Sequence, residues 1–397
     1  MEISKEQERQ SVQNLADSGR PIEQLETPRL LLDESRMMRN VARLKQRLGN
    51  LGVPLRPHLK TVKSIEVARR VINGPTGPAT VSTLKEAEQF GAAGICDLLY
   101  AVGITPNKLD RVSAIRAGGI DLSVIVGNLE AARAVAAKAR ATHDRIPTLI
   151  EVDSDGHRSG IQIDDIQGLV EVGRALQDGG AELRGVMTHA GGSYDCRGTA
   201  QLEAAAEQER AGAVRAATAL RQANLSAPVV SVGSTPTAFF ARDLTGVTEV
   251  RAGTFVFFDL FMTGLGVCTC DDIALSVLAT VVDHHRAKGW ILVDAGWTAM
   301  SRDRGTAKQP VDQGYGLVCD SLGRPYEGLI MTEANQEHGI LAIRPGSIAC
   351  LPELPIGAFV RILPNHACAT SAQHDRYSVI GPDSNRVAAQ WPIFRGW

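Results

Sequence analysis

The sequence predicts an α/β fold: a (β/α)8 barrel of the TIM type followed by a second, β-rich domain. Two observations predict it. Short runs rich in Val, Leu and Ile alternate with helical segments eight times within about 200 residues, which is typical of such barrels. After Met262 helical periods become rare, and apolar runs are separated by Gly, Pro and Asp. An open doubly wound sheet is the alternative to the barrel, because strand order cannot be read from a sequence.

The expected barrel strands are eight short apolar runs: 54–60, 80–83, 97–102, 121–126, 147–153, 183–189, 228–232 and 249–252. The helices expected between them carry apolar residues at helical spacing: 64–72, 84–90, 106–117, 129–141, 164–177 and a long one within 201–223. Glycine pairs at 118–119 and 179–180 end two of these helices.

Three parts of the chain are expected: an N-terminal arm over 1–26, a barrel over 27–262 and a β-rich domain over 263–397. Strand-like runs of the last part cover 273–282, 289–293, 339–343, 347–350 and 359–362. The run at 29–32 is a candidate further strand of this domain.

Composition narrows the class of protein. Of 397 residues, 44% are hydrophobic and 22% charged, an ordinary globular composition. The formal net charge is −2 and no basic block stands out, which argues against a nucleic acid or an anionic membrane as partner. No apolar run approaches the ~20 residues of a membrane helix, and residues 1–20 are polar, unlike a targeting peptide.

The seven cysteines are scattered and odd in number. This pattern argues against a disulfide framework and for a reducing cytoplasm. Cys268 and Cys270 would face the same side of a strand, but no second pair supports a metal site there, so core or surface thiols are expected.

Lys60 lies in the stretch Arg-Pro-His-Leu-Lys-Thr at 56–61. Pro57 favours extended geometry at Arg56, so Lys60 is expected at or just past the C-terminal end of the first strand. A lysine beside His58 and Arg56 at a partly buried strand end is a candidate reactive amine. Taken alone, the stretch favours a solvated lysine, whereas the other strand ends favour the reactive one.

In a barrel, chemistry belongs to the C-terminal ends of the strands. The seventh and eighth expected strands end in small or hydroxyl-bearing residues, namely Gly233, Ser234, Thr235, Gly253 and Thr254. Such segments bind phosphate in barrels, although Gly-Ser-Thr-Pro is also an ordinary turn. A lysine amine on the first strand together with a phosphate cradle on the last two indicates a pyridoxal phosphate site.

A second candidate site is the stretch Pro-Asn-His-Ala-Cys at 364–368. Residues i and i+2 of an extended segment point the same way, so His366 and Cys368 are expected side by side. An imidazole and a thiolate suit zinc, and two protein ligands leave positions for water and substrate. A core cysteine beside a buried histidine is the alternative.

Three stretches together resemble the metal-activated D-serine dehydratase / D-threonine aldolase family: 56–61, Gly-Val-Met-Thr-His-Ala-Gly at 185–191, and 364–368. These are pyridoxal phosphate enzymes of fold type III, related to alanine racemase. The resemblance covers about residues 27–380. It implies an alanine-racemase-like barrel with a β domain, a homodimer, pyridoxal 5'-phosphate, and a divalent metal, either zinc or manganese.

The resemblance also implies roles for individual residues. Lys60 is implied as the lysine that forms a Schiff base with the cofactor. The other implied cofactor-binding residues are His58, Arg158, His189, Tyr194, Gly233, Ser234, Thr235, Gly253 and Thr254, and the implied metal ligands are His366 and Cys368. Val62 departs from the pattern, because many members have a second histidine there, and this leaves the substrate open.

The implied function is a lyase acting on β-hydroxy D-amino acids. Dehydratases of the family carry cysteine as the second metal ligand and aldolases carry aspartate, so Cys368 favours a D-serine or D-3-hydroxyaspartate dehydratase that forms a keto acid and ammonia. D-threonine aldolase-type cleavage to glycine and an aldehyde is the alternative. Two further alternatives fit the chain poorly. One is an amino acid racemase, which needs no metal; the other is a non-catalytic pyridoxal phosphate-binding protein, which lacks the β-rich domain and the metal pair.

Overall fold

The computed structural model describes residues 17–381 and 385–397. The chain divides into two compact units. One, called here the barrel unit, consists of Ala42–Phe255 with Arg395–Trp397. The other, the β unit, consists of the described residues within Met1–Val41 and Val256–Phe394. Helix α2 (Glu34–Asn50) carries the chain from the β unit into the barrel unit.

The strands of the barrel unit form a parallel sheet that closes on itself. Their order is β2-β10-β9-β8-β6-β5-β4-β3, and a parallel bridge between His58 and Thr80 joins its two ends. The strands are β2 (Leu55–Pro57), β3 (Ala79–Val81), β4 (Asp97–Gly103), β5 (Asp121–Val126), β6 (Pro147–Asp153), β8 (Glu182–Met187), β9 (Val229–Val232) and β10 (Glu249–Ala252), with β7 (Ile161–Gln162) paired to β6. The predicted barrel is confirmed, and the open sheet is excluded.

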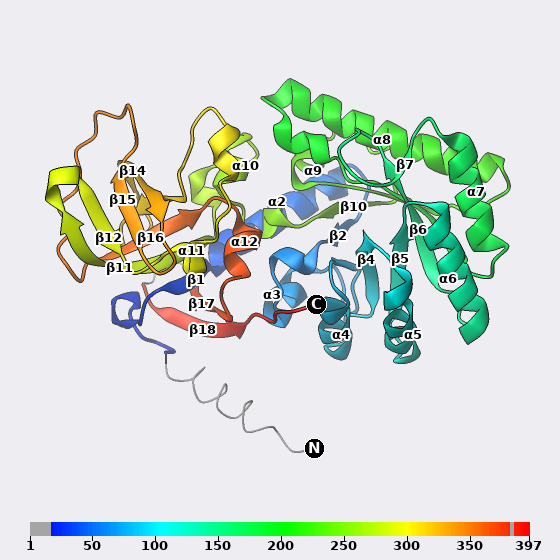
Figure 1. The fold of residues 1–397 in the computed structure, drawn as a ribbon, viewed down its shortest axis with the longest axis horizontal. Helices are drawn as coiled ribbons and strands as arrows, with labels where there is room; N and C mark the ends of the chain where they lie inside the picture. Colours follow the sequence, from blue (N-terminus) through cyan, green and yellow to red (C-terminus); the bar gives the residue numbers. More distant parts are fainter. Residues whose placement is uncertain (1–16, 382–384) are drawn as a thin grey trace, which may run out of the picture. The chain divides into compact units, whose positions relative to one another are not determined.

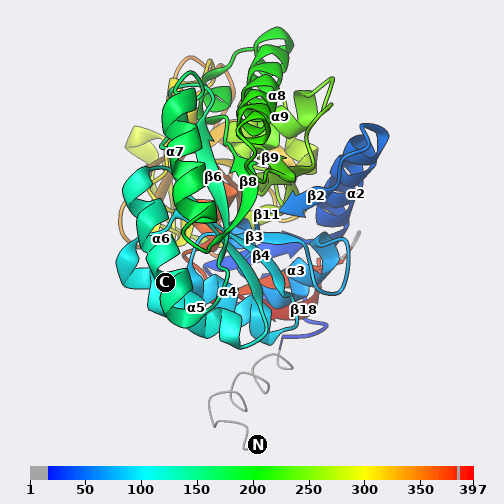
Figure 2. The same cartoon turned by 90° about the vertical axis from the view of Figure 1, so that its right-hand side faces the viewer.

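Helices lie outside these strands, as Figures 1 and 2 show for α4 to α7. Their bounds are α3 (Ile65–Val71), α4 (Leu84–Ala92), α5 (Leu109–Ala117), α6 (Leu129–Thr142), α7 (Ile166–Gln177), α8 (Thr199–Gln222) and α9 (Thr235–Phe240). Thr83, Asn128 and Asp165 begin three of them, because each side chain accepts an N–H group of the first helical turn. These caps and the apolar periodicity explain why most helices match their predicted ranges.

Three barrel strands end before their predicted positions: β3 ends at Val81 instead of 83, and the other two stop where the candidate site begins. The strand expected over 54–60 ends at Pro57 and is followed by a 3-10 turn, η2 (Leu59–Thr61). The strand expected over 183–189 ends at Met187. Polar residues follow both strands, but one backbone hydrogen bond to the neighbouring strand continues past each end: His58 N–H donates to the Ala252 carbonyl at 2.7 Å and Thr188 N–H to the Ser231 carbonyl at 3.0 Å.

The β unit contains a second closed ring, built from six antiparallel strands in the order β11-β12-β15-β14-β13-β16. Strands β1, β17 and β18 extend the sheet from β11. The strands are β1 (Arg29–Asp33), β11 (Leu275–His285), β12 (Trp290–Val293), β13 (Gly316–Cys319), β14 (Pro325–Ala334), β15 (Gly339–Ile343), β16 (Phe359–Pro364), β17 (Arg376–Ile380) and β18 (Val387–Pro392). The short helices of the unit are α10 (Leu260–Gly264), α11 (Trp297–Met300) and α12 (Ala367–Ser371).

The β-rich character of this unit is confirmed, and β1 joins its sheet as expected for 29–32. The strand expected over 347–350 is wrong: those residues are irregular and follow a turn at 345–346, and Ile348 is 98% exposed. Four strands (β13, β14, β17 and β18) were not predicted. In β14, only the three residues Leu329–Met331 form an apolar run, between the exposed Glu327 and Glu333, and so short a run gives a weak strand signal.

The arm expected over 1–26 lies, for residues 1–16, outside the described residues. Its remaining part packs on the β unit, since Ile22 and Leu25 are buried in a cluster with Leu31, Leu278, Ile380 and Val387. Within the described ranges, no helix combines the length and the apolar character required to cross a membrane.

Candidate active site

Lys60 lies in the turn η2, just past the C-terminal end of β2. The turn is held by His58, whose Nδ1 accepts the Lys60 backbone N–H at 3.5 Å. Its other side packs on Gly253, where an added Cβ would lie 2.8 Å from the Thr61 hydroxyl. The Lys60 side chain is exposed rather than partly buried. The geometry therefore presents the amine at the end of the barrel that the sequence indicated.

The sequence suggested Arg56 as a cation beside the Lys60 amine, but its guanidinium is engaged elsewhere. Its guanidinium is paired with Glu249 at 2.7 Å and Asp97 at 2.8 Å, the first residues of β10 and β4. It therefore points towards the opposite end of the barrel and has a structural role.

Arg251 is the cation that lies near the site instead, and sequence reasoning missed it. It is buried in β10, where its Nη1 donates to the Ser231 hydroxyl at 2.7 Å and its Nη2 to the Thr188 carbonyl at 2.5 Å. A single arginine within an apolar strand is not a recognisable motif. The one feature of the sequence that could have marked Arg251 is its position two residues before Gly253 and Thr254, at the end of the eighth strand.

Two histidines at this end of the barrel are neutral at physiological pH. Burial lowers the pKa of His58 well below its usual value, and the charges of Lys60 and Arg251 act in the same direction. Burial also lowers the pKa of His189 to about 3, against the effect of its hydrogen bond to Gly233. Since a carbonyl only accepts, the 2.8 Å contact with the Gly233 oxygen assigns the proton to His189 Nδ1 and leaves Nε2 unprotonated.

The segment expected to hold phosphate contains buried hydroxyl groups. Ser234 and Thr235 are both buried, and Ser234 caps α9 through Thr237. The Ser234 hydroxyl also lies 2.9 Å from that of Ser193. The Gly233 N–H is engaged, because it donates to Glu209 at 2.9 Å, so hydroxyls rather than this amide remain for an anion.

Glycine is required at 233 for a different reason than anion access. Its φ is 142°, and an added Cβ would lie 1.9 Å from the Arg251 carbonyl oxygen on the neighbouring strand. Thr254 is buried directly after Gly253. The exposed amine of Lys60, an unprotonated imidazole nitrogen and buried hydroxyls at strand ends together form a donor set that fits pyridoxal phosphate.

Arg158 and Tyr194 complete the predicted set. Tyr194 lies in the 3-10 turn η4 (Gly191–Asp195), with its ring centre 6.0 Å from that of His189. Arg158 is exposed, and its side chain packs over Gly191, where an added Cβ would lie 3.3 Å from the arginine Cγ. Its charge contributes to lowering the pKa of His189. All predicted cofactor residues thus lie in the barrel unit, at the C-terminal ends of its strands.

His366 and Cys368 lie side by side in the β unit, but not for the predicted reason. The stretch is not extended throughout: His366 is the N-cap of α12, and Cys368 lies in the first turn of that helix. The thiol is still within hydrogen-bonding reach of the imidazole. Burial lowers the pKa of His366, but the charge of Cys368 and a hydrogen bond to Asp303 outweigh it and raise the pKa to about 11.

Two carboxylates that the sequence did not reveal hold this pair. Asp303 Oδ2 lies 2.7 Å from His366 Nδ1, which leaves Nε2 as the ring nitrogen for a metal. The buried Asp259 accepts the Ala367 N–H at 2.9 Å and so fixes the start of α12. Both lie far from His366 in the sequence, so spacing could not identify them. The donor pair and the carboxylate behind the histidine fit a divalent metal.

Within residues 17–381 and 385–397, no group of three or more His, Cys, Asp or Glu side chains is placed to hold a metal. The pair would therefore provide two protein ligands and leave the remaining positions open. Cys268 is buried beside Thr263, Cys270 is half-buried, and all seven cysteines are free thiols.

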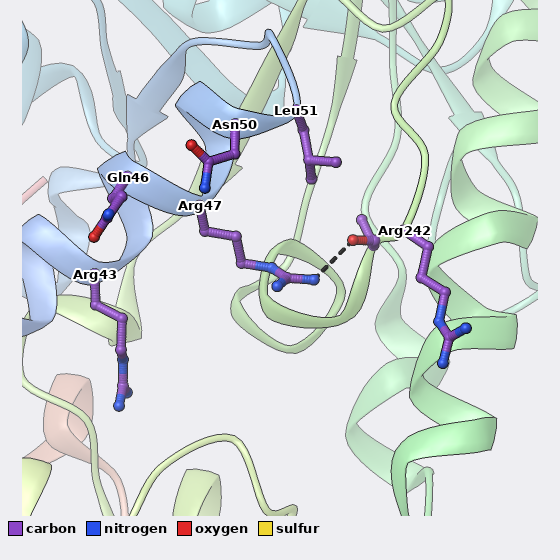
Figure 3. Close-up of a pocket in the computed structure, with 7 residues that line it drawn as sticks. Arg43, Gln46, Arg47, Asn50, Leu51 and Arg242 are labelled. Atoms are coloured by element: carbon purple, nitrogen blue, oxygen red, sulfur yellow. Dashed lines mark hydrogen bonds between the residues drawn. The ribbon is translucent and has the colours of Figure 1, made fainter.

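A separate pocket of about 440 Å³ on the barrel unit is lined by α2 and the segment after α9 (Figure 3). It contains three arginines, all of which have contacts within the protein. Arg47 donates to the Ala241 carbonyl at 2.8 Å, the dashed line in Figure 3. Arg242 pairs with Glu203 at 2.7 Å, and Arg43 lies over the Phe239 ring. These contacts explain the arginines as supports of α9 and α8.

Comparisons with known proteins agree with this geometry. Residues 32–260 match the family model of the alanine racemase N-terminal domain, and residues 274–380 match that of the serine dehydratase domain. The chain is 53% identical over 375 residues to D-threo-3-hydroxyaspartate dehydratase of Delftia sp. (strain HT23), covering 94% of this chain and 98% of the relative. It is 28% identical over 387 residues to D-serine dehydratase of Dictyostelium discoideum, covering 92% of this chain and 96% of the relative.

A solved structure gives the same result. A cysteine-to-alanine mutant of D-threo-3-hydroxyaspartate dehydratase, in the metal-free form, has a TM-score of 0.91 and 51% sequence identity, covering 95% of this chain and 100% of that one. The protein therefore belongs to the family that joins an alanine racemase N-terminal domain to a serine dehydratase domain and that includes D-threo-3-hydroxyaspartate dehydratase.

Proposed function

We propose that the protein is a pyridoxal phosphate- and metal-dependent dehydratase of β-hydroxy D-amino acids, with D-3-hydroxyaspartate and D-serine as substrates and a keto acid and ammonia as products. The observation that carries the proposal is the His366–Cys368 pair, with Asp303 at 2.7 Å from the imidazole, in a chain that also presents Lys60 at a barrel mouth. A donor pair for metal distinguishes this chemistry from racemisation. The name of the Delftia relative supports the substrate class.

In this proposal each barrel residue acts through a stated atom. Lys60 Nζ would hold the cofactor, and its amine is the group that would take the proton from the substrate Cα. The hydroxyls of Ser234 and Thr235 would hold the phosphate group. Pyridoxal phosphate, when bound, supplies a conjugated ring that delocalises negative charge from the carbon beside the substrate amine.

His189 orients rather than transfers a proton in this proposal. Its Nδ1–H is committed to the Gly233 carbonyl at 2.8 Å, and its low pKa keeps Nε2 unprotonated. A neutral imidazole adds no positive charge to the site. The ring therefore supports the cofactor by contact, together with Tyr194.

The metal would be held by His366 Nε2 and Cys368 Sγ, with Asp303 fixing the imidazole. A metal at such a pair supplies Lewis acidity that makes a hydroxyl a better leaving group. Imidazole and thiolate donors favour zinc, and manganese is the alternative. That a solved relative is named as a metal-free form supports a metal in the native state.

Alternative activities receive less support. Cleavage of the D-threonine aldolase type uses the same cofactor and metal, and cysteine at 368 is the feature that favours dehydration. A racemase would have no use for the His366–Cys368 pair. A non-catalytic binding protein would not need the β unit.

Three finer assignments belong to the same proposal. Residues 27–262 are proposed as the cofactor-binding part and 263–397 as the metal-binding part. The second boundary is close to the division between Phe255 and Val256, but residues 27–41 belong to the β unit. The protein acts as a homodimer, and it resides in the cytoplasm, where its free cysteines stay reduced.

A substrate panel tests the proposal. The purified protein, loaded with pyridoxal phosphate and metal, is incubated with D-serine, D-threonine and D-3-hydroxyaspartate, and keto acid, ammonia and glycine are measured. We expect keto acid and ammonia in equal amounts, most rapidly from D-3-hydroxyaspartate. Glycine with an aldehyde as the main products would favour the aldolase, and the L-enantiomer reacting equally well would contradict the proposal.

A further inference from the structure

Glu209 is a buried carboxylate with no place in the proposed chemistry. It lies in the middle of α8 and is 2% exposed. One oxygen, Oε1, accepts two backbone N–H groups, from Ala190 and from Gly233, each at 2.9 Å. These amides belong to the loops that follow β8 and β9, so a single atom of α8 joins the ends of two neighbouring strands.

Both amides are directly connected to candidate cofactor-binding residues. Ala190 follows His189, and Gly233 precedes Ser234. The two loops are also linked to each other, because His189 Nδ1 donates to the Gly233 carbonyl at 2.8 Å. Glu209 therefore holds two backbone segments. One is Ala190, next to His189, and the other is Gly233, whose carbonyl accepts the His189 Nδ1–H.

A chain of hydroxyls continues from the same carboxylate. The Thr237 hydroxyl bonds to Glu209 and lies 3.0 Å from that of Ser234. The Ser234 hydroxyl lies 2.9 Å from that of Ser193, which donates to the Ala190 carbonyl at 2.7 Å. Because Ser193 gives its one proton to Ala190, Ser234 donates to Ser193 in this structure, and it would have to turn the same proton to a bound phosphate.

We propose that Glu209 is a positioning residue of the cofactor site, which fixes the tautomer and direction of His189 and the orientation of the Ser234 hydroxyl from behind. The inference rests on the proposed function for the identity of the cofactor. The contacts of Glu209 with the Ala190 and Gly233 amides rest on geometry alone. A carboxyl in this position is costly to bury unless its oxygens are bonded, and here three groups bond it. Burial raises its pKa, but the two N–H bonds need only an acceptor.

Three substitutions separate acceptor, charge and reach. Glu209→Gln keeps an acceptor oxygen and removes the charge. Glu209→Met removes the acceptor but keeps a side chain of similar size. Glu209→Asp keeps the charge, but the shorter side chain places the carboxylate further from the Ala190 and Gly233 N–H groups. Glu207→Met is the matched control, because Glu207 lies on the same helix, is exposed, and pairs with Arg210 at 2.6 Å at the surface.

Two readouts are used besides turnover. In the cofactor-free protein, 15N NMR of labelled histidine reports the tautomer of His189, assigned by its loss in His189→Gln. We expect the Nδ1–H form in wild type, Glu209→Gln and Glu207→Met, and a mixture of tautomers in Glu209→Met and Glu209→Asp. The second readout is the affinity for pyridoxal phosphate. We expect it to fall about 10-fold or more in Glu209→Met and Glu209→Asp, and to change less than about threefold in Glu209→Gln.

An unchanged tautomer and affinity in both Glu209→Met and Glu209→Asp would overturn the inference. So would a loss in Glu209→Gln as large as in Glu209→Met, since charge rather than the acceptor would then matter. If Glu209→Met does not fold, Glu209→Asp decides. Failure of the proposed function can be told apart from failure of this inference. In the first case wild type would bind no cofactor or form no keto acid, whereas the tautomer measurement would still show whether Glu209 positions His189.

Discussion

Lys60 and His189 define the chemistry of the site at the scale of single residues. The amine is exposed on a 3-10 turn, and the imidazole is half-buried and neutral. Positive charge near the imidazole comes from Arg158 and from Arg251, which bonds to Ser231 and the Thr188 carbonyl inside the barrel. The site therefore combines an exposed amine with a hydrogen-bonded polar surround.

The first prediction concerns the amine. Lys60→Ala should remove the visible absorbance of bound pyridoxal phosphate, because only an amine at this position can link to the cofactor. Borohydride treatment followed by peptide mapping should place the reduced label on Lys60 in wild type. Lys63→Ala is the matched control, since that amine pairs with the buried Glu86 at 3.4 Å and should not carry the cofactor. A label on another lysine would contradict the assignment.

The second prediction concerns pH. The pKa of His189 is about 3 in the folded protein, below its ordinary value of 6.5, so the unfolded chain binds a proton at pH values where the folded protein does not. Stability of the cofactor-free protein should therefore fall as pH decreases from 6.5 towards 3. The contribution of this residue is roughly 1.4 kcal/mol per pH unit in that window.

Denaturant titrations between neutral and acidic pH measure this effect. His189→Gln should flatten the dependence of unfolding free energy on pH, whatever its effect at neutral pH. His338→Gln, at an exposed position, is the control and should leave the slope unchanged. Equal slopes in wild type and His189→Gln would show that the imidazole is not held neutral.

Residue types and their order predicted Lys60, the hydroxyl segment and the His366–Cys368 pair. The family resemblance is confirmed by the matching family models and relatives. What the sequence did not reveal are residues that act through tertiary contacts: Arg251, Glu209 and Asp303 each meet their partners across many residues of chain. No local pattern distinguishes them from ordinary charged residues.

At the scale of elements, α9 connects stability to cofactor binding. It is six residues long, and Ser234 caps it in a reciprocal box with Thr237. The hydroxyl that would hold phosphate therefore also closes the first turn of the helix. Helix α12 has a similar double role, since His366 is both its N-cap residue and a candidate metal ligand.

The third prediction follows from α9. The double substitution Ser234→Ala, Thr235→Ala should weaken pyridoxal phosphate affinity more than it lowers kcat at saturating cofactor, because these hydroxyls are remote from the bonds that change. Loss of the cap should also cost about 1 kcal/mol of stability. Asn128→Ala, which removes the cap of α6, is the control and should lower stability without changing cofactor affinity. Unchanged affinity in the double variant would place the phosphate elsewhere.

The fourth prediction follows from the support of α12. Asp303→Asn should weaken metal binding about 10- to 100-fold, because the carboxylate fixes the ring and raises its basicity. Competition with a coloured chelator measures the affinity. Asp283→Asn, an exposed change in the same unit, should have no effect. Equal affinities in both variants would mean that Asp303 does not support a metal ligand.

Elements were predictable where the apolar pattern is long, as in the strands β5 and β6, or is joined by an N-cap, as in α7. They were not predictable where the apolar run of a strand is only three residues long, as in β14, or where a helix is too short to show a period, as in α12. The last case matters, because the helical turn rather than an extended segment brings His366 and Cys368 together.

At the scale of the whole molecule, the chain combines two closed sheets, each with its own candidate group of functional residues. The parallel ring carries the amine and the hydroxyls, and the antiparallel ring carries the imidazole and thiol. Since the two groups lie in different units, cofactor binding and metal binding should be separable by experiment.

The most direct test of the central claim is the effect of metal removal on the reaction of D-3-hydroxyaspartate. The loaded enzyme is treated with a chelator, keto acid, ammonia and glycine are measured, and the cofactor absorbance is recorded. We expect chelation, or Cys368→Ala, to abolish keto acid formation while the cofactor spectrum remains, and added zinc to restore turnover of the chelated wild type. Keto acid formed at the full rate without metal would contradict the account.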